Sequence, residues 1–369
     1  MLRLFLSLAV VPVLLLSAAS VRAELPTLIP RKVLFGNPSK TSPQISPDGK
    51  HLAYLAPDDK NVLQVFVQTL GMDDARKVTN DKKRGIRIYL WTYAPGILLY
   101  AQDNDGDENF HIYSVDLKNE KTTDLTPFPK VRATPIHLDR HYPNDMLAIL
   151  NKENPRLFDV YRIDLTTGEL KLDTKNPGDV VGWDVDPKFR VRAAQAMTKD
   201  GGMEIRVRTD ENSPWKVAIK WGPDDVDGRI IDFTADGKSL WLTSSEGRDT
   251  LSLVKRDLET GKDELIAADP GVDAGSTLVN PNTHEVEAVS FNRERIKWKG
   301  LNPKITEDLE NLEKSGRGEP SVVSTDREWQ TWVVAYTSDL HATEYYLYDR
   351  ATKKQTRLFS SRPELEQGF

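Results

Sequence analysis

A repeat of about 46 residues runs through most of this chain, and it restricts the possible folds more than any other feature of the sequence. Its first marker is a predicted strand that ends in an acidic residue at the start of a turn. These acids are Asp116, Asp164, Asp257 and Asp349, at intervals of 48, 93 and 92 residues. The two longer intervals are each close to twice the repeat length, and a weaker copy at 205–210 falls inside the first of them.

A second marker, a short turn after the first predicted strand of each unit, recurs in the same order along the chain. Runs of Val, Ile, Leu, Tyr and Trp separate these turns, which is the pattern of strands joined by tight hairpins. The turns are Ser46–Gly49, Ala94–Gly96, Tyr142–Asp145, Asp186–Lys188, Ala235–Gly237, Asn280–Asn282 and Thr325–Asp326. The sequence therefore predicts seven units.

Seven units of four short strands predict an all-β fold, a seven-bladed β-propeller with about 46 residues per blade, over residues 38–361. A single blade cannot bury both of its faces, so the blades must stack around an axis. A pair of β-sandwiches is the alternative, but it does not produce seven matched turns. The tryptophans, among them Trp91, Trp183 and Trp241, are interpreted as packing between blades at similar positions.

The sixth blade departs from the pattern. Between Pro303 and Gly316 the sequence predicts a short helical insertion, with Thr306 as its N-cap and with Leu309 and Leu312 on one face. We expect this helix to replace or precede the outer strand of blade six.

Residues 1–23 have the features of a signal peptide. Arg3 is followed by an almost entirely apolar run, Leu4–Leu16, and cleavage is expected after Ala23. The run is shorter than the roughly 20 apolar residues that cross a bilayer, so a retained membrane anchor is the less favoured alternative. We expect the mature product to be periplasmic or secreted, with no stable membrane anchor, and residues 24–37 to lead into the propeller.

The charge balance and the absence of cysteine exclude several function classes. Lysine and arginine number 50 against 56 acidic residues, a net charge of -6, so no nucleic acid partner is expected. Because the chain has no cysteine, disulfides, thiolate zinc sites and cysteine nucleophiles are impossible.

The sequence has no motif for hydrolytic or metal chemistry. A serine hydrolase of the α/β type needs Gly-x-Ser-x-Gly, and the closest segment, Thr243–Gly247, lacks the first glycine and is interpreted as a hairpin. No histidines have the His-Glu-x-x-His spacing, and the prolines that flank His137 and His141 argue against a helix there. We therefore predict no catalytic residue, no metal site and no cofactor.

The densest acidic stretch, Gln102–Asn109, contains the candidate site residues. A hairpin turn at Asn104–Gly106 is the simplest interpretation, because these residue types tolerate positive φ. Contact with a substrate or with a neighbouring domain is the second interpretation. A calcium site is the third, but the glycine stands at the fourth place of the loop, whereas an EF-hand needs it at the sixth. The candidate residues are Asp103, Asp105, Asp107, Glu108 and Asn109.

Eight segments carry a further signal through their composition and their order. They are Leu34–Pro38, Ile45–Gly49, Ala53–Pro57, Asp103–Asn109, Asp124–Phe128, Phe158–Tyr161, Leu358–Phe359 and Arg362–Leu365. Together they closely resemble the N-terminal β-propeller of bacterial prolyl oligopeptidase-family serine peptidases. The Ser-Pro-Asp-Gly turn is common to many propellers, but the Gly-Asp-Glu-Asn stretch and the order of the segments make the match specific. The resemblance covers essentially the whole chain after residue 23.

The resemblance implies a role and leaves part of the family pattern unmatched. In that family the segment like Arg362–Leu365 leads into an α/β-hydrolase domain with the catalytic serine, aspartate and histidine. Residues 362–369 are therefore interpreted as a truncated interdomain linker, and no catalytic residue of the family has a matching position here. The family's propeller is a lid and filter that covers the active-site cleft and admits short peptides.

Three functions remain open on this basis. The first is an exported, non-catalytic propeller that binds a peptide or a protein, descended or truncated from such a peptidase. The second is the propeller half of a split serine peptidase whose α/β-hydrolase is a separate chain. The third is a metal-dependent propeller enzyme with ligands that converge on the ring axis. In the first two cases we expect an exposed apolar or charge-patterned patch on the docking face.

Overall fold

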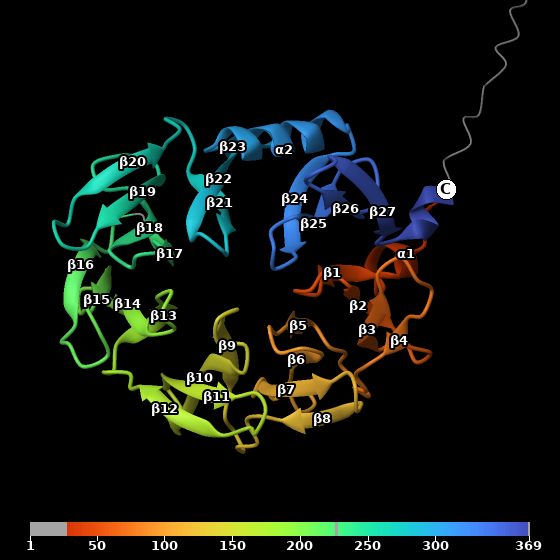
Figure 1. The fold of residues 1–369 in the computed structure, drawn as a ribbon, viewed down its shortest axis with the longest axis horizontal. Helices are drawn as coiled ribbons and strands as arrows, with labels where there is room; N and C mark the ends of the chain where they lie inside the picture. Colours follow the sequence, from red (N-terminus) through yellow and green to blue (C-terminus); the bar gives the residue numbers. More distant parts are fainter. Residues whose placement is uncertain (1–27, 226–227, 368–369) are drawn as a thin grey trace, which may run out of the picture.

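The structure, a computed structural model, describes residues 28–225 and 228–367. Seven antiparallel sheets surround a common axis, and each is built from one continuous stretch of chain (Figure 1). The seven-bladed β-propeller is therefore confirmed. The predicted signal peptide, residues 1–23, lies outside the described residues, and the predicted domain bounds stay predictions.

Each blade runs from an inner first strand to an outer last element, in the order of the sequence (Figure 1). Blade 1 contains β1 (Thr41–Ile45), β2 (His51–Pro57), β3 (Leu63–Thr69) and β4 (Arg76–Lys77). Blade 2 contains β5 (Ile88–Trp91), β6 (Ile97–Gln102), β7 (His111–Asp116) and β8 (Lys121–Asp124). Blade 3 contains β9 (Ala133–Leu138), β10 (Asp145–Asn154), β11 (Leu157–Asp164) and β12 (Leu170–Thr174).

The remaining four blades continue the same order. Blade 4 contains β13 (Val180–Val185), β14 (Val191–Met197), β15 (Met203–Val207) and β16 (Lys216–Trp221). Blade 5 contains β17 (Arg229–Phe233), β18 (Ser239–Ser244), β19 (Ser252–Asp257) and β20 (Asp263–Ala267). Blade 6 contains β21 (Ala274–Asn280), β22 (Glu285–Asn292) and β23 (Ile296–Gly300). Blade 7 contains β24 (Glu319–Thr325), β25 (Thr331–Thr337), β26 (Glu344–Asp349) and β27 (Lys354–Ser360).

Two short helical segments flank the ring. The helix α1 (Arg31–Phe35) precedes β1, and the 3-10 helix η1 (Pro363–Gln367) follows β27. They fall in the segments 24–37 and 362–369, which the sequence predicts to lie outside the blades. Of the helices in the described part of the chain, none is long and apolar enough to cross a membrane.

The acidic residues that mark the repeat close the turn between the third and fourth strands. In blade 2 the Asp116 carboxylate accepts the Lys118 N–H at 2.8 Å. Asp164 and Asp257 accept the corresponding N–H groups, two positions on, in blades 3 and 5, and Asp349 accepts the Thr352 N–H, three positions on, in blade 7. A carboxylate at this place satisfies backbone donors that the hairpin leaves unpaired, which explains why the sequence repeats it.

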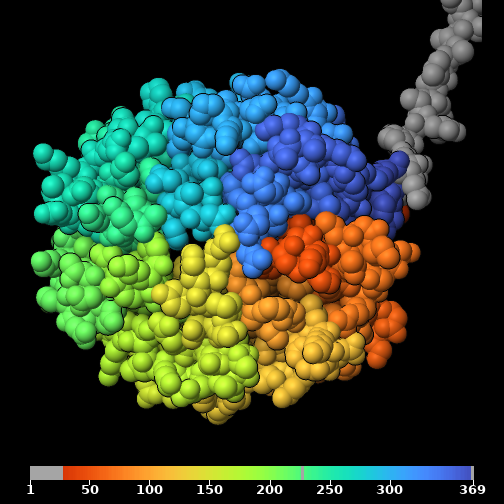
Figure 2. Space-filling view, in the orientation of Figure 1, coloured from red at the N-terminus to blue at the C-terminus, as the bar shows by residue number. Residues whose placement is uncertain are grey.

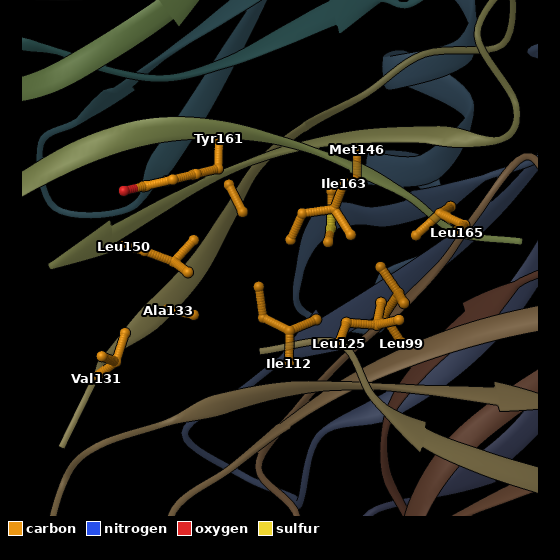
Figure 3. Packing of buried hydrophobic residues seen from close by; sticks show 11 residues of the cluster. Leu99, Ile112, Leu125, Val131, Ala133, Met146, Leu150, Tyr161, Ile163 and Leu165 are labelled. Atoms are coloured by element: carbon orange, nitrogen blue, oxygen red, sulfur yellow. The ribbon is translucent and has the colours of Figure 1, made fainter. Parts of the chain in front are cut away.

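Apolar side chains from facing sheets hold neighbouring blades together. Figure 3 shows Leu99 and Ile112 of blade 2 facing Met146 and Ile163 of blade 3, and all four side chains are almost completely buried. Within the described residues, one such cluster lies at each interface between neighbouring blades. Burying one aliphatic side chain contributes roughly 1.5–3 kcal/mol. Each blade is therefore stabilised mainly by its two neighbours.

The tryptophans contribute to this packing, although not all of them at the same blade position. Trp91 on β5 and Trp183 on β13 each donate the indole N–H to a backbone carbonyl of the preceding blade, at 3.1 and 3.2 Å. Trp241 lies on β18, a second strand, and packs against Leu253 and Ala267 in the cluster between blades 5 and 6. The prediction of similar positions is therefore right for Trp91 and Trp183 and wrong for Trp241.

Blade 6 has three strands, and the helix α2 (Pro303–Lys314) follows them on the outer side of the blade (Figure 1). The helical insertion in blade six is confirmed, and Leu309 and Leu312 are buried as expected. The prediction of Thr306 as the N-cap is wrong. Proline is favoured at the first helical position, so the helix begins one turn earlier than predicted. The N-cap is Asn302, whose side chain accepts the Ile305 N–H at 3.0 Å.

A buried carboxylate on α2 ties the helix to blade 7. Asp308 is 1% exposed. Its Oδ1 accepts hydrogen bonds from the Tyr348 hydroxyl at 2.8 Å and from the Lys353 ammonium at 2.6 Å. Its Oδ2 accepts one from the Arg350 guanidinium at 2.8 Å. The helix therefore supplies the counter-charge for two cations of the last blade.

Within residues 28–225 and 228–367, no strand is shared between the first and last blades where the ring closes. β1 belongs to blade 1 and lies beside β24 of blade 7. The Ile45 N–H donates to Ser324 Oγ at 3.1 Å, and the Arg327 N–H donates to the Pro47 carbonyl at 2.9 Å. Val333 joins Ile45 in one apolar cluster. Side-chain packing and loop contacts therefore seal the ring.

We expect Asp308→Ala to lower the free energy of unfolding by about 3–5 kcal/mol, because it leaves two poorly exposed cations without their carboxylate. Urea unfolding followed by tryptophan fluorescence measures the change. Glu307→Ala is the matched control, since Glu307 is exposed and also contacts Lys353, at 3.2 Å. Its cost should stay below about 1 kcal/mol. Equal costs for the two variants would contradict the proposed importance of Asp308.

Candidate functional site

Both ends of the described chain lie on the same face of the ring. A four-stranded antiparallel blade returns the chain to the face at which it entered, because each strand reverses the direction of the one before. β1 therefore starts, and β27 ends, at the face that carries the loops between second and third strands. We call this the terminal face; its loops are 58–62, 103–110, 155–156, 198–202, 245–251, 293–295 and 338–343. The opposite face carries the turns between first and second strands, and we call it the turn face.

The two ends are held against each other. The Arg362 guanidinium donates to the carbonyls of Val33 and Gly36, at 2.7 Å each. The Ser39 N–H donates to the Ser361 carbonyl at 2.9 Å. Figure 1 shows α1 next to the C-terminal segment. Anything joined to η1 therefore starts beside α1.

An apolar groove of about 740 Å³ opens between these ends and the loop 338–343. Leu340, which lines it, is 88% exposed, and Phe35, at the end of α1, is 81% exposed. Large apolar side chains that gather on a surface mark places where another protein packs. We call this the end groove; it is lined chiefly by Leu28, Leu34, Leu340, Arg362 and Leu365.

The predicted site residues lie in the loop between β6 and β7, and so on the terminal face. Asp107 Oδ1 accepts the N–H of Asn104 at 3.2 Å and that of Asn109 at 3.0 Å. A side-chain hydrogen bond from Asn109 is the main cause that lowers the pKa of Asp107. Asp103 Oδ2 accepts the Glu108 N–H at 3.3 Å. Two of the four acidic side chains of the loop, Asp103 and Asp107, therefore accept hydrogen bonds from the loop's own backbone.

The backbone of this loop explains much of its unusual sequence. Asp105, Gly106 and Glu108 adopt positive φ, at 56°, 93° and 60°. The Arg84 guanidinium packs so closely on Gly106 that a Cβ there would come within 2.6 Å of Nη1. Lys83 forms an ion pair with Asp105 at 2.6 Å, with both side chains exposed. Loop 103–110 is thus held against the basic loop 78–87, a contact that the sequence did not predict. The positive φ of Asp105 and Gly106 agrees with the interpretation of this segment as a turn.

Of the predicted residues, Asp105, Asp107 and Glu108 are exposed to a partner, whereas Asp103 and Asn109 are half-buried. Contact of the predicted residues with a substrate or a neighbouring domain stays a prediction. Within residues 28–225 and 228–367, no three His, Asp or Glu side chains are grouped so that they could hold a metal ion.

We expect Gly106→Ala to lower the free energy of unfolding by about 1–2 kcal/mol, because its φ strains an L residue and the added methyl meets Arg84. Asp105→Ala removes only an exposed ion pair and should cost less than about 1 kcal/mol. Thermal unfolding of the two variants measures both effects. The reverse order would show that the carboxylate, and not the turn, holds the loop.

Four titratable side chains from consecutive blades gather near the ring axis, at the turn-face ends of the inner strands. They are His137 on β9, Asp184 on β13, Asp232 on β17 and His284 in the turn after β21. His284 Nδ1 lies 3.0 Å from Asp232 Oδ2, and this hydrogen bond raises the pKa of His284. Burial, together with the charge of Asp232, raises the pKa of Asp184 to about 7. Burial lowers the pKa of His137.

Arg140, in the turn of blade 3, reaches across the axis to the opposite side of the ring. Its guanidinium donates to the Asn282 side chain of blade 6 and, at 3.0 Å, to the Arg327 carbonyl of blade 7. Its Nη2 also lies 3.3 Å from Glu328. Figure 2 shows the yellow turn of blade 3 meeting blue turns near the centre of this face. The sequence alone does not reveal the role of Arg140, because its partners lie 142 to 188 positions away.

We expect Asp184→Asn to stabilise the protein more at pH 8 than at pH 5. The folded state keeps the Asp184 proton up to about pH 7, whereas the unfolded chain loses it near 3.8, so wild-type stability falls as the pH rises between these values. The asparagine removes this loss, which is about 2–3 kcal/mol between pH 5 and pH 8. Urea unfolding at both pH values measures it.

A second group, His284, also makes the stability of the protein depend on pH. His284 contributes in the same direction, because its raised pKa gives stability at low pH that is lost as the pH rises, so part of the wild-type slope must remain in the variant. Asp59→Asn, in an exposed loop, controls for the removal of a charge as such. Parallel pH profiles for wild type and Asp184→Asn would contradict the prediction.

The histidines show no hydrolase-type arrangement in the part of the chain that the structure describes. Three of them lie against carboxylates, His111 at 2.7 Å from Asp124, His141 at 3.0 Å from Asp139, and His284 as described above. No histidine ring there has a serine hydroxyl as a hydrogen-bond partner. His137 lies on a strand and His141 in the turn that follows it, so the two do not share a helical face.

Curated proteins with peptidase names match this chain along nearly its whole length. Dipeptidyl aminopeptidase BIII of Pseudoxanthomonas mexicana is 40% identical over 346 residues, which cover 92% of this chain and 49% of that protein. Dipeptidyl peptidase family member 6 of Caenorhabditis elegans is 29% identical over 355 residues, covering 92% and 48%. This chain therefore spans about half the length of the curated relatives it matches. No family model matches the sequence.

Solved structures of similar fold also come from peptidases. A prolyl endopeptidase aligns with a TM-score of 0.64 and 10% identity, over 88% of this chain and 50% of that one. A puromycin-hydrolysing peptidase of Mycobacterium tuberculosis aligns with a TM-score of 0.62 and 13% identity, over 89% and 54%. At these sequence identities the similarity shows the fold alone. This chain covers about half of each solved structure, as it covers about half of each curated relative.

Proposed function

We propose that this chain is an exported, non-catalytic module that docks an α/β-hydrolase and restricts the substrates of that hydrolase to short peptides. The chain belongs to the prolyl oligopeptidase family of serine peptidases, and it corresponds to the β-propeller part of that family. The observation that carries the proposal is the end groove. Both chain ends meet there, and Leu340 and Phe35 expose most of their apolar surface beside them.

The exposed apolar surface supports docking on physical grounds. Leaving a leucine or phenylalanine in water forgoes roughly 1.5–3 kcal/mol that burial would contribute. Such residues are scattered on most surfaces, but here several gather in one groove between the two ends of the propeller. A hydrolase joined to η1, or bound from a separate chain, would begin beside this groove and cover it.

The relatives support the substrate class. The name of the Pseudoxanthomonas mexicana protein describes a dipeptidyl aminopeptidase, and this chain matches about half of it. We infer that the hydrolase works on peptides, and that the propeller's terminal face, including the acidic loop 103–110, limits what reaches it. The predicted signal peptide supports action in the periplasm or outside the cell.

The alternative, a peptide- or protein-binding module that works without a hydrolase, uses the same terminal face. The two proposals differ in what restores peptidase activity. Under the first, a hydrolase placed next to η1 becomes active on dipeptidyl substrates; under the second, it does not.

The purified chain should be inactive on chromogenic aminoacyl and dipeptidyl substrates. Fusing it to the part of the Pseudoxanthomonas mexicana dipeptidyl aminopeptidase that it does not match should restore turnover of dipeptidyl substrates. Separately expressed halves should associate, and Leu340→Asp should weaken that association about 10- to 100-fold, because a buried leucine contributes roughly 1.5–3 kcal/mol. Titration calorimetry of the two halves measures the change.

Leu172→Asp is the matched control, because Leu172 is also an exposed leucine, at 53%, but lies on the outer strand β12 away from the end groove. It should leave association unchanged. Turnover by the purified chain alone, abolished by a serine-directed phosphonate, would refute the non-catalytic role. An equal effect of both aspartate variants would refute the end groove as the docking surface.

A further inference from the structure

We propose that a pocket on the turn face binds a short peptide or amino acid with free, oppositely charged ends. The pocket has a volume of about 520 Å³, within the range of small-ligand sites. It lies between blades 1 and 2 and is completed by Arg327 from blade 7. It is on the face opposite the end groove and the loop 103–110, so it does not depend on the proposed docking of a hydrolase.

Three residues with ring side chains, His51, Trp91 and Tyr93, line the pocket. The Trp91 indole is fixed by its hydrogen bond to the Gln44 carbonyl at 3.1 Å. The His51 ring lies 6.4 Å from the Trp91 ring, between centroids. Burial is the main cause that raises the pKa of Tyr93, so its hydroxyl keeps its proton and can donate to a ligand. Such a surface suits an apolar or aromatic side chain beside polar ligand ends.

Two carboxylates on the pocket wall are held ionised. Asp48 Oδ1 accepts the Ser46 hydroxyl at 2.6 Å and the Lys50 N–H at 3.1 Å. Burial opposes its ionisation, but these hydrogen bonds leave its pKa below the ordinary value. Hydrogen bonds from the Thr69 hydroxyl and N–H, at 2.7 and 2.8 Å, lower the pKa of Asp74. Both carboxylates are therefore negative at neutral pH.

No ion pair among the described residues involves Asp48 or Asp74, although the charges of Lys50 and His51 help to lower the pKa of Asp48, and that of His51 helps to lower the pKa of Asp74. Among these residues, neither carboxylate therefore has a cationic group in direct contact. A ligand ammonium group placed in the pocket can supply it. Charge-assisted hydrogen bonds of this kind are about twice as strong as neutral ones. The aromatic faces of Trp91 and Tyr93 also favour a cation.

The same pocket offers cations for a ligand carboxylate. Lys118 forms no ion pair within the described residues. The Arg327 side chain is 47% exposed, and its one ion pair among the described residues, with the exposed Glu328 at 3.3 Å, is weak. Arg76 also lines the pocket, but it already forms an ion pair with Glu120 at 2.6 Å, so we do not assign it to the ligand carboxylate. The lining thus carries both negative and positive side chains, and a ligand with one ammonium group and one carboxylate group can pair with both at once.

The test is titration of the purified chain with the dipeptide Gly-Phe, followed by calorimetry or by NMR. We expect a Kd of about 0.1–1 mM, because a ligand with so few atoms gains only a small binding free energy. N-acetylation should weaken binding at least about tenfold by removing the ammonium, and C-terminal amidation should do the same by removing the carboxylate.

Variants assign each ligand end to a side of the pocket. Asp48→Asn removes the charge but keeps the oxygen that accepts from Ser46, so the turn should survive while Gly-Phe binding falls at least about tenfold. Arg327→Gln should weaken Gly-Phe in the same way but leave the weak binding of the amidated peptide unchanged. Circular dichroism and thermal unfolding check that both variants are folded.

Asp236→Asn is the matched control. Asp236 holds the equivalent turn in blade 5, where it accepts the Thr234 hydroxyl at 2.7 Å and the Lys238 N–H at 3.0 Å, and it does not line the pocket. It should leave binding unchanged. The proposal is overturned if Gly-Phe does not bind at millimolar concentration, if both blocked peptides bind as well as the free one, or if Asp236→Asn weakens binding as much as Asp48→Asn. None of these outcomes bears on whether a hydrolase docks at the end groove.

Discussion

The face-to-face packing of seven sheets is the constraint on which every other feature of this protein depends. A blade has two apolar faces and can cover neither, so each interface stabilises two blades and the last interface requires blade 7 to meet blade 1. In the part of the chain that the structure describes, no strand is shared across that seam. Ile45 and Val333 pack across it, and loop hydrogen bonds complete it. Ring closure therefore rests on the same apolar burial as every other blade contact.

The strand count of the blades gives the two faces different possible roles. Because four antiparallel strands return the chain to its starting face, both ends and the acidic loop 103–110 share the terminal face. The turn face holds the tight turns, the Arg140 bridge and the pocket beside Trp91. The proposed docking surface and the proposed ligand pocket therefore lie on opposite faces of the ring.

The site shows where reasoning from sequence succeeds and where it stops. The turn at Asn104–Gly106 was predictable, because Asn, Asp and Gly tolerate positive φ wherever they occur. The packing of Arg84 on Gly106 was not, because it joins two different loops. The N-cap at Thr306 was placed a turn too late, since Asn302 and Thr306 are both good capping residues and only the observed start at Pro303 distinguishes them.

The sequence by itself determined the number of blades, the places of their turns and the helical insertion in blade six. These features depend on local patterns, namely alternating apolar residues and turn chemistry, and seven repetitions make such patterns unmistakable. Only the tertiary structure decided which side chains meet across the axis, as Arg140 and Asn282 do, and which charges share a pocket, as Asp48 and Arg327 do. The physical reason is that ring curvature brings together residues more than a hundred positions apart, and no local pattern records that distance.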